Sequence, residues 1–254
     1  MLASSGMKPN LLALLIFPVS AFAGLSEPAA SNACSPQPDA TQAQHVIGYG
    51  SLMQDSSRMR TAPHAGAARP VMVKGYQRGW FSRSQSHGLG TTYLGVVADV
   101  TSSLNAVLYQ IDATELAAFD RRERGYCRVA VSPSAVKPLA GERPSAGQIW
   151  IYEVRPGEAA EADEDHPVAQ SYVDIFLDGC IEQEERFHLS GFATQCVRTT
   201  YGWSTSWVND RVYPRRPSAF QPRATQIDQL LADELPAYWS QIRLEGGGVR
   251  NARR

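Results

Sequence analysis

Residues 45–52 read HVIGYGSL, a short apolar strand pattern that runs into a glycine turn. Gly48 and Gly50 let the backbone turn sharply and let a ligand approach it closely, because glycine has no side chain. Consecutive exposed N–H groups in such a turn form an anion-binding nest. The same spacing also fits an ordinary Gly-Ser turn. It is not a dinucleotide fingerprint, since Met53 occupies the place of the third glycine, and Ser51 lacks the surroundings of a nucleophilic serine.

A second distinctive stretch, residues 120–126, reads DRRERGY. Consecutive charges at a helix end usually form a solvated surface. Glu123 differs from its neighbours, because a carboxylate at a helix C-terminus meets the negative end of the helix dipole, which disfavours its charge. Partial burial raises the pKa of a carboxyl further, towards that of a useful general base. The stretch is therefore either a solvated face or the site of a catalytic glutamate.

Strand patterns surround one helix in the central region. We predict this helix over Asp112–Glu123, because Asp112 and Glu115 have the spacing of a capping box. The predicted strands lie around Val71 and Val73, and at Thr91–Val100, Leu104–Ile111, Tyr126–Val131 and Gln148–Val154, with a turn at Thr101–Ser103. Many strands with few helices indicate an α+β fold in which a mixed sheet curls into a barrel.

The C-terminal part of the chain has helical spacing. One helix is predicted after Pro167 and another over Ile227–Ile242. We therefore predict five parts: a signal peptide (1–23), a flexible linker (24–44), the strand-rich domain (45–155), a helical C-terminal extension packed on that domain (156–245) and a disordered tail (246–254).

The composition is that of a globular protein. The chain has 254 residues, of which 43% are hydrophobic and 19% charged, which excludes a disordered or fibrous protein. Its formal net charge of −1 shows no basic excess, so we expect no nucleic-acid partner. The four cysteines form no CxxC pair and the five histidines are scattered, so no metal site is predicted.

The N-terminus has the features of a secretory signal peptide. Residues 11–23 read LLALLIFPVSAFA, preceded by Lys8 and ended by an A-x-A cleavage pattern, Ala21 to Ala23. The apolar run is short for a membrane span, and Pro18 interrupts it; a membrane anchor and a buried helix are the alternatives. We predict an exported protein, periplasmic or secreted, with no stable membrane insertion after cleavage.

Export changes what the cysteines imply. All four lie after the predicted cleavage site, and an oxidising compartment allows them up to two disulfides. We favour Cys180–Cys196, because both residues lie in the helical C-terminal part. Cys34 can pair with any of the other three.

Taken together, the two motifs resemble the γ-glutamylcyclotransferase-like superfamily, with YGSL after the first strand and D-x-R-E-x-x-Y after a later helix. Supporting matches are KGYQRGW at residues 74–80 and AVLY at residues 106–109. The resemblance covers about His45 to Val154 and implies a small mixed β-barrel flanked by helices. A later stretch, WVNDR at residues 207–211 followed by YPR at 213–215, also resembles bacterial relatives.

The resemblance implies a reaction in which a γ-glutamyl amine or peptide is split to 5-oxoproline and a free amine. No metal or organic cofactor is needed. By motif position, the acid/base role falls to Glu123, and substrate binding to Tyr49, Gly50, Ser51, Leu52 and Tyr126. Glu123 would accept a proton from the substrate's α-ammonium and later deliver it to the leaving amine. Ring closure within one molecule could draw on about 7–11 kcal/mol from orientation.

Further substrate contacts and rival functions complete the expectations. Arg58, Arg83 and Tyr93 are additional candidates for contact with the substrate. One rival is a non-catalytic module that binds a γ-glutamyl ligand, and another is a thiol-dependent enzyme that uses Cys127. The leaving amine and the oligomeric state stay open.

Overall fold

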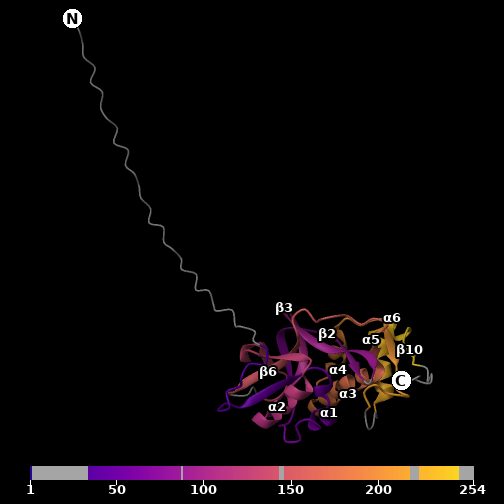
Figure 1. The fold of residues 1–254 in the computed structure, drawn as a ribbon, viewed down its shortest axis with the longest axis horizontal. Helices are drawn as coiled ribbons and strands as arrows, with labels where there is room; N and C mark the ends of the chain where they lie inside the picture. The colour runs from indigo at the N-terminus through magenta and orange to yellow at the C-terminus, as the bar shows by residue number, and fades with distance from the viewer. Residues whose placement is uncertain (2–33, 87, 143–145, 218–222, 246–254) are drawn as a thin grey trace. The chain divides into compact units, whose positions relative to one another are not determined.

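The computed structural model of the chain describes residues 34–86, 88–142, 146–217 and 223–245, together with Met1. The predicted signal peptide and tail lie outside these ranges, Met1 apart, as do residues 24–33 of the predicted linker. The described residues from Cys34 onward belong to one compact unit (Figure 1). No helix within these ranges is both long and apolar enough to cross a membrane.

A ten-stranded mixed sheet forms the framework of this unit. Its strands are β1 (Gln44–Gly48), β2 (Arg69–Ser86), β3 (Leu89–Ile111), β4 (Tyr126–Ala130), β5 (Val136–Pro138), β6 (Gln148–Val154), β7 (Val168–Ala169), β8 (Thr200–Tyr201), β9 (Trp207–Asn209) and β10 (Arg243–Leu244). The main path runs β10-β9-β7-β3-β1-β6-β4, and β2 pairs with β3, β5 and β8.

Six α-helices and two short 3₁₀ turns accompany the sheet in the described ranges. They are η1 (Ser51–Met53), α1 (Asp55–Met59), α2 (Ala113–Arg122), η2 (Pro133–Ala135), α3 (Gln170–Phe187), α4 (Phe192–Arg198), α5 (Ala224–Glu234) and α6 (Pro236–Trp239). Helices α5 and α6 lie at the opposite end of the unit from α2 and β6 (Figure 1). The predicted α+β class is confirmed. The sheet stays open rather than closing into a barrel, because β10 and β4, at the two ends of the path, do not pair with each other.

The central strand β1 positions the glycine turn. It runs antiparallel to β3 and parallel to β6, and all of its residues are buried. Val46 and Ile47 are fully buried, and the polar Gln44 and His45 before them are buried as well. The chain leaves the sheet at Gly48 and enters η1, so residues 49–53 lie at one end of the central strand.

Strands β2 and β3 differ from the prediction of separate short strands. The two segments predicted at 91–100 and 104–111 form one long strand, β3, and the predicted turn lies within an irregularity of its pairing. Between the pairs Lys74↔Ser103 and Tyr76↔Ala98, Gly75 alone stands opposite residues 99–102. Gly75 has a φ of +89°, a conformation that favours glycine, and this bulge bends the ribbon without ending it.

Helix α2 confirms the predicted capping box. The Asp112 side chain accepts from the Glu115 amide at 2.7 Å, and the Glu115 carboxylate accepts from the Asp112 amide at 3.3 Å. Phe119 is buried and packs 5.8 Å from Tyr109 of β3, ring centre to ring centre. The helix ends at Arg122, and Glu123 is its C-terminal cap.

The C-terminal part of the chain departs from the prediction, and it also adds the short strands β7, β8, β9 and β10 to the sheet. A single helix was expected over 227–242, but the chain forms α5 and α6 with a break at Leu235. Pro236 explains the break, because proline lacks an N–H donor and drives the preceding residue out of the helical region. Helix α4 was not predicted.

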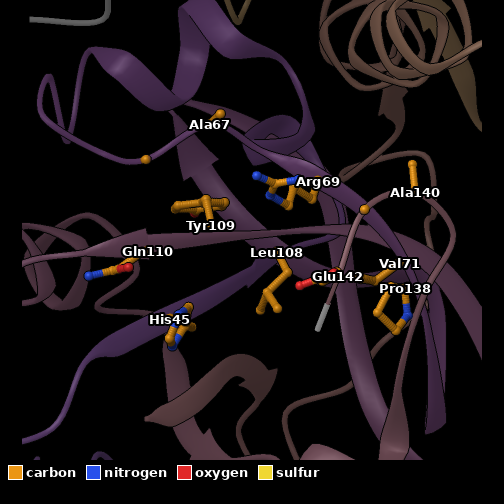
Figure 2. A pocket seen from close by; sticks show the side chains of 12 residues that line it. His45, Ala67, Arg69, Val71, Leu108, Tyr109, Gln110, Pro138, Ala140 and Glu142 are labelled. Carbon is orange, nitrogen blue, oxygen red and sulfur yellow. The ribbon is translucent and has the colours of Figure 1, made fainter. Parts of the chain in front are cut away.

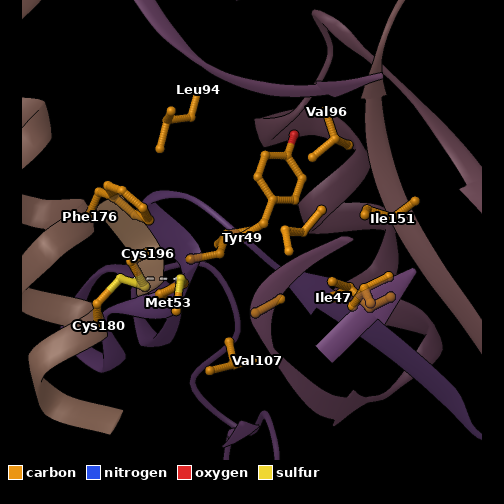
Figure 3. Packing of buried hydrophobic residues seen from close by; sticks show 14 of the residues in the cluster. Ile47, Tyr49, Met53, Leu94, Val96, Val107, Ile151, Phe176, Cys180 and Cys196 are labelled. Atoms are coloured by element: carbon orange, nitrogen blue, oxygen red, sulfur yellow. Dashed lines mark hydrogen bonds between the residues drawn. A yellow bond between two sulfur atoms is a disulfide. The ribbon is translucent and has the colours of Figure 1, made fainter. Parts of the chain in front are cut away.

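Both disulfides in the described chain involve cysteines considered from the sequence. Cys180 of α3 is bonded to Cys196 of α4, as predicted, and Cys34 to Cys127 of β4. Figure 3 shows the first bond in the buried core beside Met53, with Phe176 close by. The second bond holds the segment before β1 along β4, and the Ser35 amide donates to the Arg128 carbonyl at 2.9 Å.

Candidate active site

The two sequence motifs meet in one narrow pocket of about 30 Å³. The turn after β1 forms one wall, and the residue that caps α2 forms another. The pocket is lined by Ile47, Tyr49, Gly50, Ser51, Leu52, Leu94, Glu123, Tyr126, Tyr152 and Tyr172. All six residues assigned to the site from the sequence are therefore brought together.

A wider basin of about 370 Å³ adjoins this inner pocket. The two share Ser51, Glu123, Tyr126 and Tyr172, so Glu123 faces both spaces. The basin is additionally lined by Ser82, Arg83, Ser84, Gln85, Tyr93, Arg122, Arg124, Gly125, Val154, Glu158 and Arg216. A ligand could place one end in the narrow pocket and the remainder in the basin.

Close packing explains the two glycines of the turn. A Cβ atom on Gly48 would lie 2.9 Å from Cβ of Leu52, and one on Gly50 would lie 2.9 Å from the Tyr172 hydroxyl oxygen. The turn is closed by the Met53 amide, which donates to the Gly50 carbonyl at 3.0 Å. Within the described part of the chain, the amides of residues 50–52 have no backbone acceptor. The Ser51 amide donates to the Tyr172 hydroxyl, which leaves the amides of Gly50 and Leu52 as the candidates for binding an anionic ligand.

Two of the site tyrosines have their hydroxyls engaged with backbone. Tyr49, whose exposed fraction is 8%, donates to the Tyr152 carbonyl at 2.6 Å. Tyr126 donates to the Leu94 carbonyl at 2.9 Å. Burial raises the pKa of both phenols well above its usual value. Both groups therefore stay neutral and shape the pocket instead of exchanging protons.

Glu123 occupies a largely buried position, with 16% of its side chain exposed. Burial raises the pKa of its carboxyl above the usual value, while the charges of Arg122 and Arg216 act in the opposite direction without reversing the shift. The Arg122 Nε atom lies 3.1 Å from Glu123 Oε1. Burial with a raised pKa and an oriented carboxylate suits proton transfer.

Arg122 connects the two motifs, a role that its place in a charged run did not reveal. Its guanidinium donates to the Ser51 hydroxyl at 3.1 Å, the Ser57 carbonyl at 2.9 Å and the Thr61 hydroxyl at 2.7 Å. These bonds fix the end of α2 against the turn and α1. The only sequence signal was its place within the D-x-R-E motif.

Two further buried side chains, Arg78 and Tyr172, contact the turn after β1. Arg78, from the KGYQRGW stretch, donates to the Tyr49 carbonyl at 3.1 Å and to the Cys196 carbonyl at 2.9 Å. Tyr172 of α3 packs edge to face against Tyr93, with ring centres 5.0 Å apart. Burial raises the pKa of Tyr172 to about 12. Its helical spacing predicted only a core residue, so its place in the site was missed.

A family model described as gamma-glutamyl cyclotransferase, AIG2-like, matches residues 46–173, which is half of the chain and contains both motifs. The chain belongs to this family. The resemblance seen in the motifs is thereby confirmed. No curated protein matches the sequence.

Three solved structures are similar to this family member at low identity. A gamma-glutamyl cyclotransferase is 12% identical, with 76% of this chain and 99% of that chain covered and a TM-score of 0.48. An uncharacterized Homo sapiens protein is 14% identical, with 62% and 88% covered and a TM-score of 0.47. YkqA from Bacillus subtilis is 18% identical, with 61% and 53% covered and a TM-score of 0.46.

The other residues considered from the sequence lie in different places. Tyr93 and Arg83 line the basin, but Arg83 is paired with Asp163 at 2.6 Å. Arg58 is buried, bonded to Asp55 at 2.6 Å, and lines neither space. Cys127 is disulfide-bonded, so the alternative of a Cys127 thiol nucleophile is wrong for this structure.

The chain has a larger hollow elsewhere, of about 550 Å³ (Figure 2). Its lining includes His45, Arg69 and Glu142 and shares no residue with the inner pocket or the basin. Both family motifs line the smaller pocket and neither lines this larger hollow, so the candidate site is chosen by its motifs and not by its size. Among the described residues, no group of three or more His, Cys, Asp or Glu could hold a metal ion.

Proposed function

We propose that this chain is an enzyme that converts a γ-glutamyl amine or peptide to 5-oxoproline and a free amine, with Glu123 as the general acid/base. One observation carries the proposal: the buried Glu123 carboxyl and the Gly50–Leu52 turn face the same pocket in a member of the cyclotransferase family.

The reaction follows from this arrangement. Glu123 accepts a proton from the α-ammonium, and the freed nitrogen attacks the γ-carbonyl carbon to close a five-membered ring. The bond from that carbon to the leaving nitrogen then breaks, and Glu123 returns the proton to the departing amine. The surplus proton of the ring nitrogen also passes to this amine, so the products are a neutral lactam nitrogen and an ammonium group. The amides of Gly50 and Leu52 bind the α-carboxylate or the developing oxyanion, while the Ser51 amide holds the Tyr172 hydroxyl at the pocket wall. Tyr49, Leu52 and Tyr126 hold the glutamyl carbons.

Positioning of the base is assigned to Arg122. Its contact with Glu123 and its bond to Ser51 fix the distance between the carboxylate and the turn. An oriented base and a substrate bound in its folded conformation together favour ring closure, because the entropy cost of bringing the reacting atoms together is met on binding.

We further propose that the enzyme acts outside the cytoplasm. The two disulfides are compatible with an exported protein, because such bonds persist in oxidising compartments. The predicted signal peptide accounts for that location.

The direct test measures release of 5-oxoproline from γ-glutamyl-alanine by the purified protein. We expect Glu123→Gln to lower kcat by about 10²–10⁴-fold, because the amide cannot accept the proton. Glu153→Gln is the matched control: Glu153 is a half-buried glutamate whose pKa is also raised by burial, but it lines neither space. It should keep the parent rate.

The same assay tests the rival function of a non-catalytic binding module. Such a module would bind the γ-glutamyl ligand, as measured by calorimetry, but would release no 5-oxoproline. A parent protein without turnover, or a Glu123→Gln variant as fast as the parent, would refute the proposed mechanism.

A further inference from the structure

The basin beside Glu123 is rich in arginine. Four arginines, Arg83, Arg122, Arg124 and Arg216, line it together with two glutamates, Glu123 and Glu158. Arg216 comes from beyond the family-matched residues 46–173, so the C-terminal extension contributes part of this wall.

Two of these arginines are committed to protein partners. Arg122 is bonded to Ser51, Ser57, Thr61 and Glu123, which occupies its donors. Arg83 is bonded to the Asp163 carboxylate and, at 2.6 Å, to the Glu161 carbonyl. Neither is free to bind a ligand without losing these bonds.

Arg216 is placed differently. Its guanidinium carbon lies 5.3 Å from the centre of the Tyr93 ring, in a cation–π arrangement, and it forms no ion pair with a carboxylate in the described ranges. Tyr93 in turn packs against Tyr172, whose hydroxyl lies beside Gly50. The charge of Arg216 also lowers the pKa of Glu123 against the effect of burial, so it acts on the reacting end of the basin.

The backbone that carries Arg216 is firmly anchored. The Arg216 amide donates to the Ser171 hydroxyl at 3.1 Å, and that hydroxyl donates to Asp210 at 2.7 Å. The neighbouring Arg215 amide donates to the same Asp210 carboxylate at 2.7 Å. Asp210 is 1% exposed, so these bonds are shielded from water. The backbone at Arg216 is therefore held in place at the wall of the basin.

We propose that Arg216 binds a carboxylate on the leaving amine, so that the preferred substrates are γ-glutamyl amino acids or peptides whose leaving group carries a carboxylate near the scissile amide. This inference rests on the proposed function. The glutamyl α-carboxylate is assigned to the turn amides of the inner pocket, which Arg216 does not line. Arg216 lines only the basin, where the leaving group must lie. Guanidinium and carboxylate pair through strong charge-assisted hydrogen bonds.

The test compares two substrates that differ only in this charge, γ-glutamyl-alanine and γ-glutamyl-alaninamide. We expect the parent enzyme to have a higher kcat/KM on the acid. Arg216→Gln should lower kcat/KM on the acid by about 10- to 100-fold, the loss expected for a hydrogen bond to a charged group, mainly through KM. On the amide the loss should be much smaller, because only the effect of this charge on the pKa of Glu123 is removed.

Arg121→Gln is the matched control, because Arg121 is exposed, carries the same charge and lies close to Glu123 in the chain, but does not line the basin. It should leave the preference for the acid intact, and a thermal melt checks that Arg216→Gln folds. Equal losses on both substrates would overturn the inference, since Arg216 would then act on the glutamyl end. Equal parent rates on acid and amide would also overturn it and leave the proposed function standing. Absence of 5-oxoproline from both substrates would instead refute the proposed function, and this inference with it.

Discussion

At the scale of single residues, the raised pKa of Glu123 determines how the rate should depend on pH. The base must be ionised to accept a proton, so kcat/KM should rise with pH through the pKa of this carboxyl. Burial raises that pKa, and the acidic limb should therefore lie above the value of about 4.3 of a free glutamate. Rates measured from about pH 4 to 8 test this prediction. The variant Glu153→Gln should keep the acidic limb of the parent pH–rate profile. A parent profile whose acidic limb lies at or below the pKa of a free glutamate would contradict the prediction.

The same shift predicts an effect on stability. The folded protein holds the Glu123 proton at a pH at which the unfolded chain has lost it. Stability therefore falls as pH rises from the unfolded pKa through the folded pKa. Glu123→Gln removes this cost, so at neutral pH the variant should melt no lower than the parent. A melting temperature several degrees lower for the variant would contradict this prediction. It would mean that the contact with Arg122 stabilises the charged Glu123 by more than burial destabilises it.

The turn should depend on its backbone more than on its serine. Gly50→Val places side-chain atoms against the Tyr172 hydroxyl, where even a Cβ would lie only 2.9 Å away, and should abolish most activity. Ser51→Ala removes one bond from Arg122, which keeps its other partners, and should cost less. Steady-state rates of both variants on γ-glutamyl-alanine decide the ranking. The reverse order, with both proteins folded, would assign binding to the Ser51 hydroxyl.

At the scale of elements, the Cys180–Cys196 bond should hold the turn in place. It links α3 to α4 across a sequence separation of 16, and the Cys180 sulfur lies 3.7 Å from the Met53 sulfur of η1. Replacing both cysteines with alanine should lower the free energy of unfolding by about 3 kcal/mol, the usual value for a loop of this length. Urea denaturation without reductant measures the loss.

A matched control comes from the second bond. The double variant Cys34→Ala/Cys127→Ala should also lose stability, but KM should rise only in the Cys180/Cys196 variant, whose bond adjoins η1. A Cys180/Cys196 variant with parent stability and KM would show that packing alone fixes the turn.

Local patterns in the sequence predicted the elements that depend on neighbouring residues. The capping box of α2 needs only Asp112 and Glu115, which are three residues apart, and β6 is a short run rich in β-branched and aromatic residues. The continuity of β3 was missed, because it depends on pairing with the distant β2 around Gly75. The break at Leu235 was missed although Pro236 is a local signal, because the apolar spacing continues across it.

The candidate site divides in the same way. The six residues assigned from the motifs all line the inner pocket, because each motif is a continuous stretch. Tyr172 lines this pocket and the basin, and Arg216 lines the basin, only through the packing of α3 and of the segment after β9. No spacing in the sequence links these two residues to Glu123. Their place at the candidate site could therefore be recognised only in the folded structure.

At the scale of the whole molecule, export is the prediction to test first. Cleavage after Ala23 gives a mature chain that starts at Gly24 and keeps all four cysteines. N-terminal sequencing of the protein from its native host should find Gly24 or a residue close to it. Recovery of an intact N-terminus from the cytosol would contradict the prediction.

The segment fastened by Cys34 has a further consequence for the open sheet. Strand β4 ends the path of strands, and an uncovered end strand is a template on which another molecule can add its own strand and start aggregation. Here the Ser35 amide donates to the Arg128 carbonyl and the Arg128 amide donates to the Ser35 hydroxyl, so part of that edge is occupied by the chain itself. The Cys34–Cys127 bond keeps this cover in place. We therefore expect the disulfide to protect this edge against self-association in an oxidising environment, and a reducing environment to remove that protection.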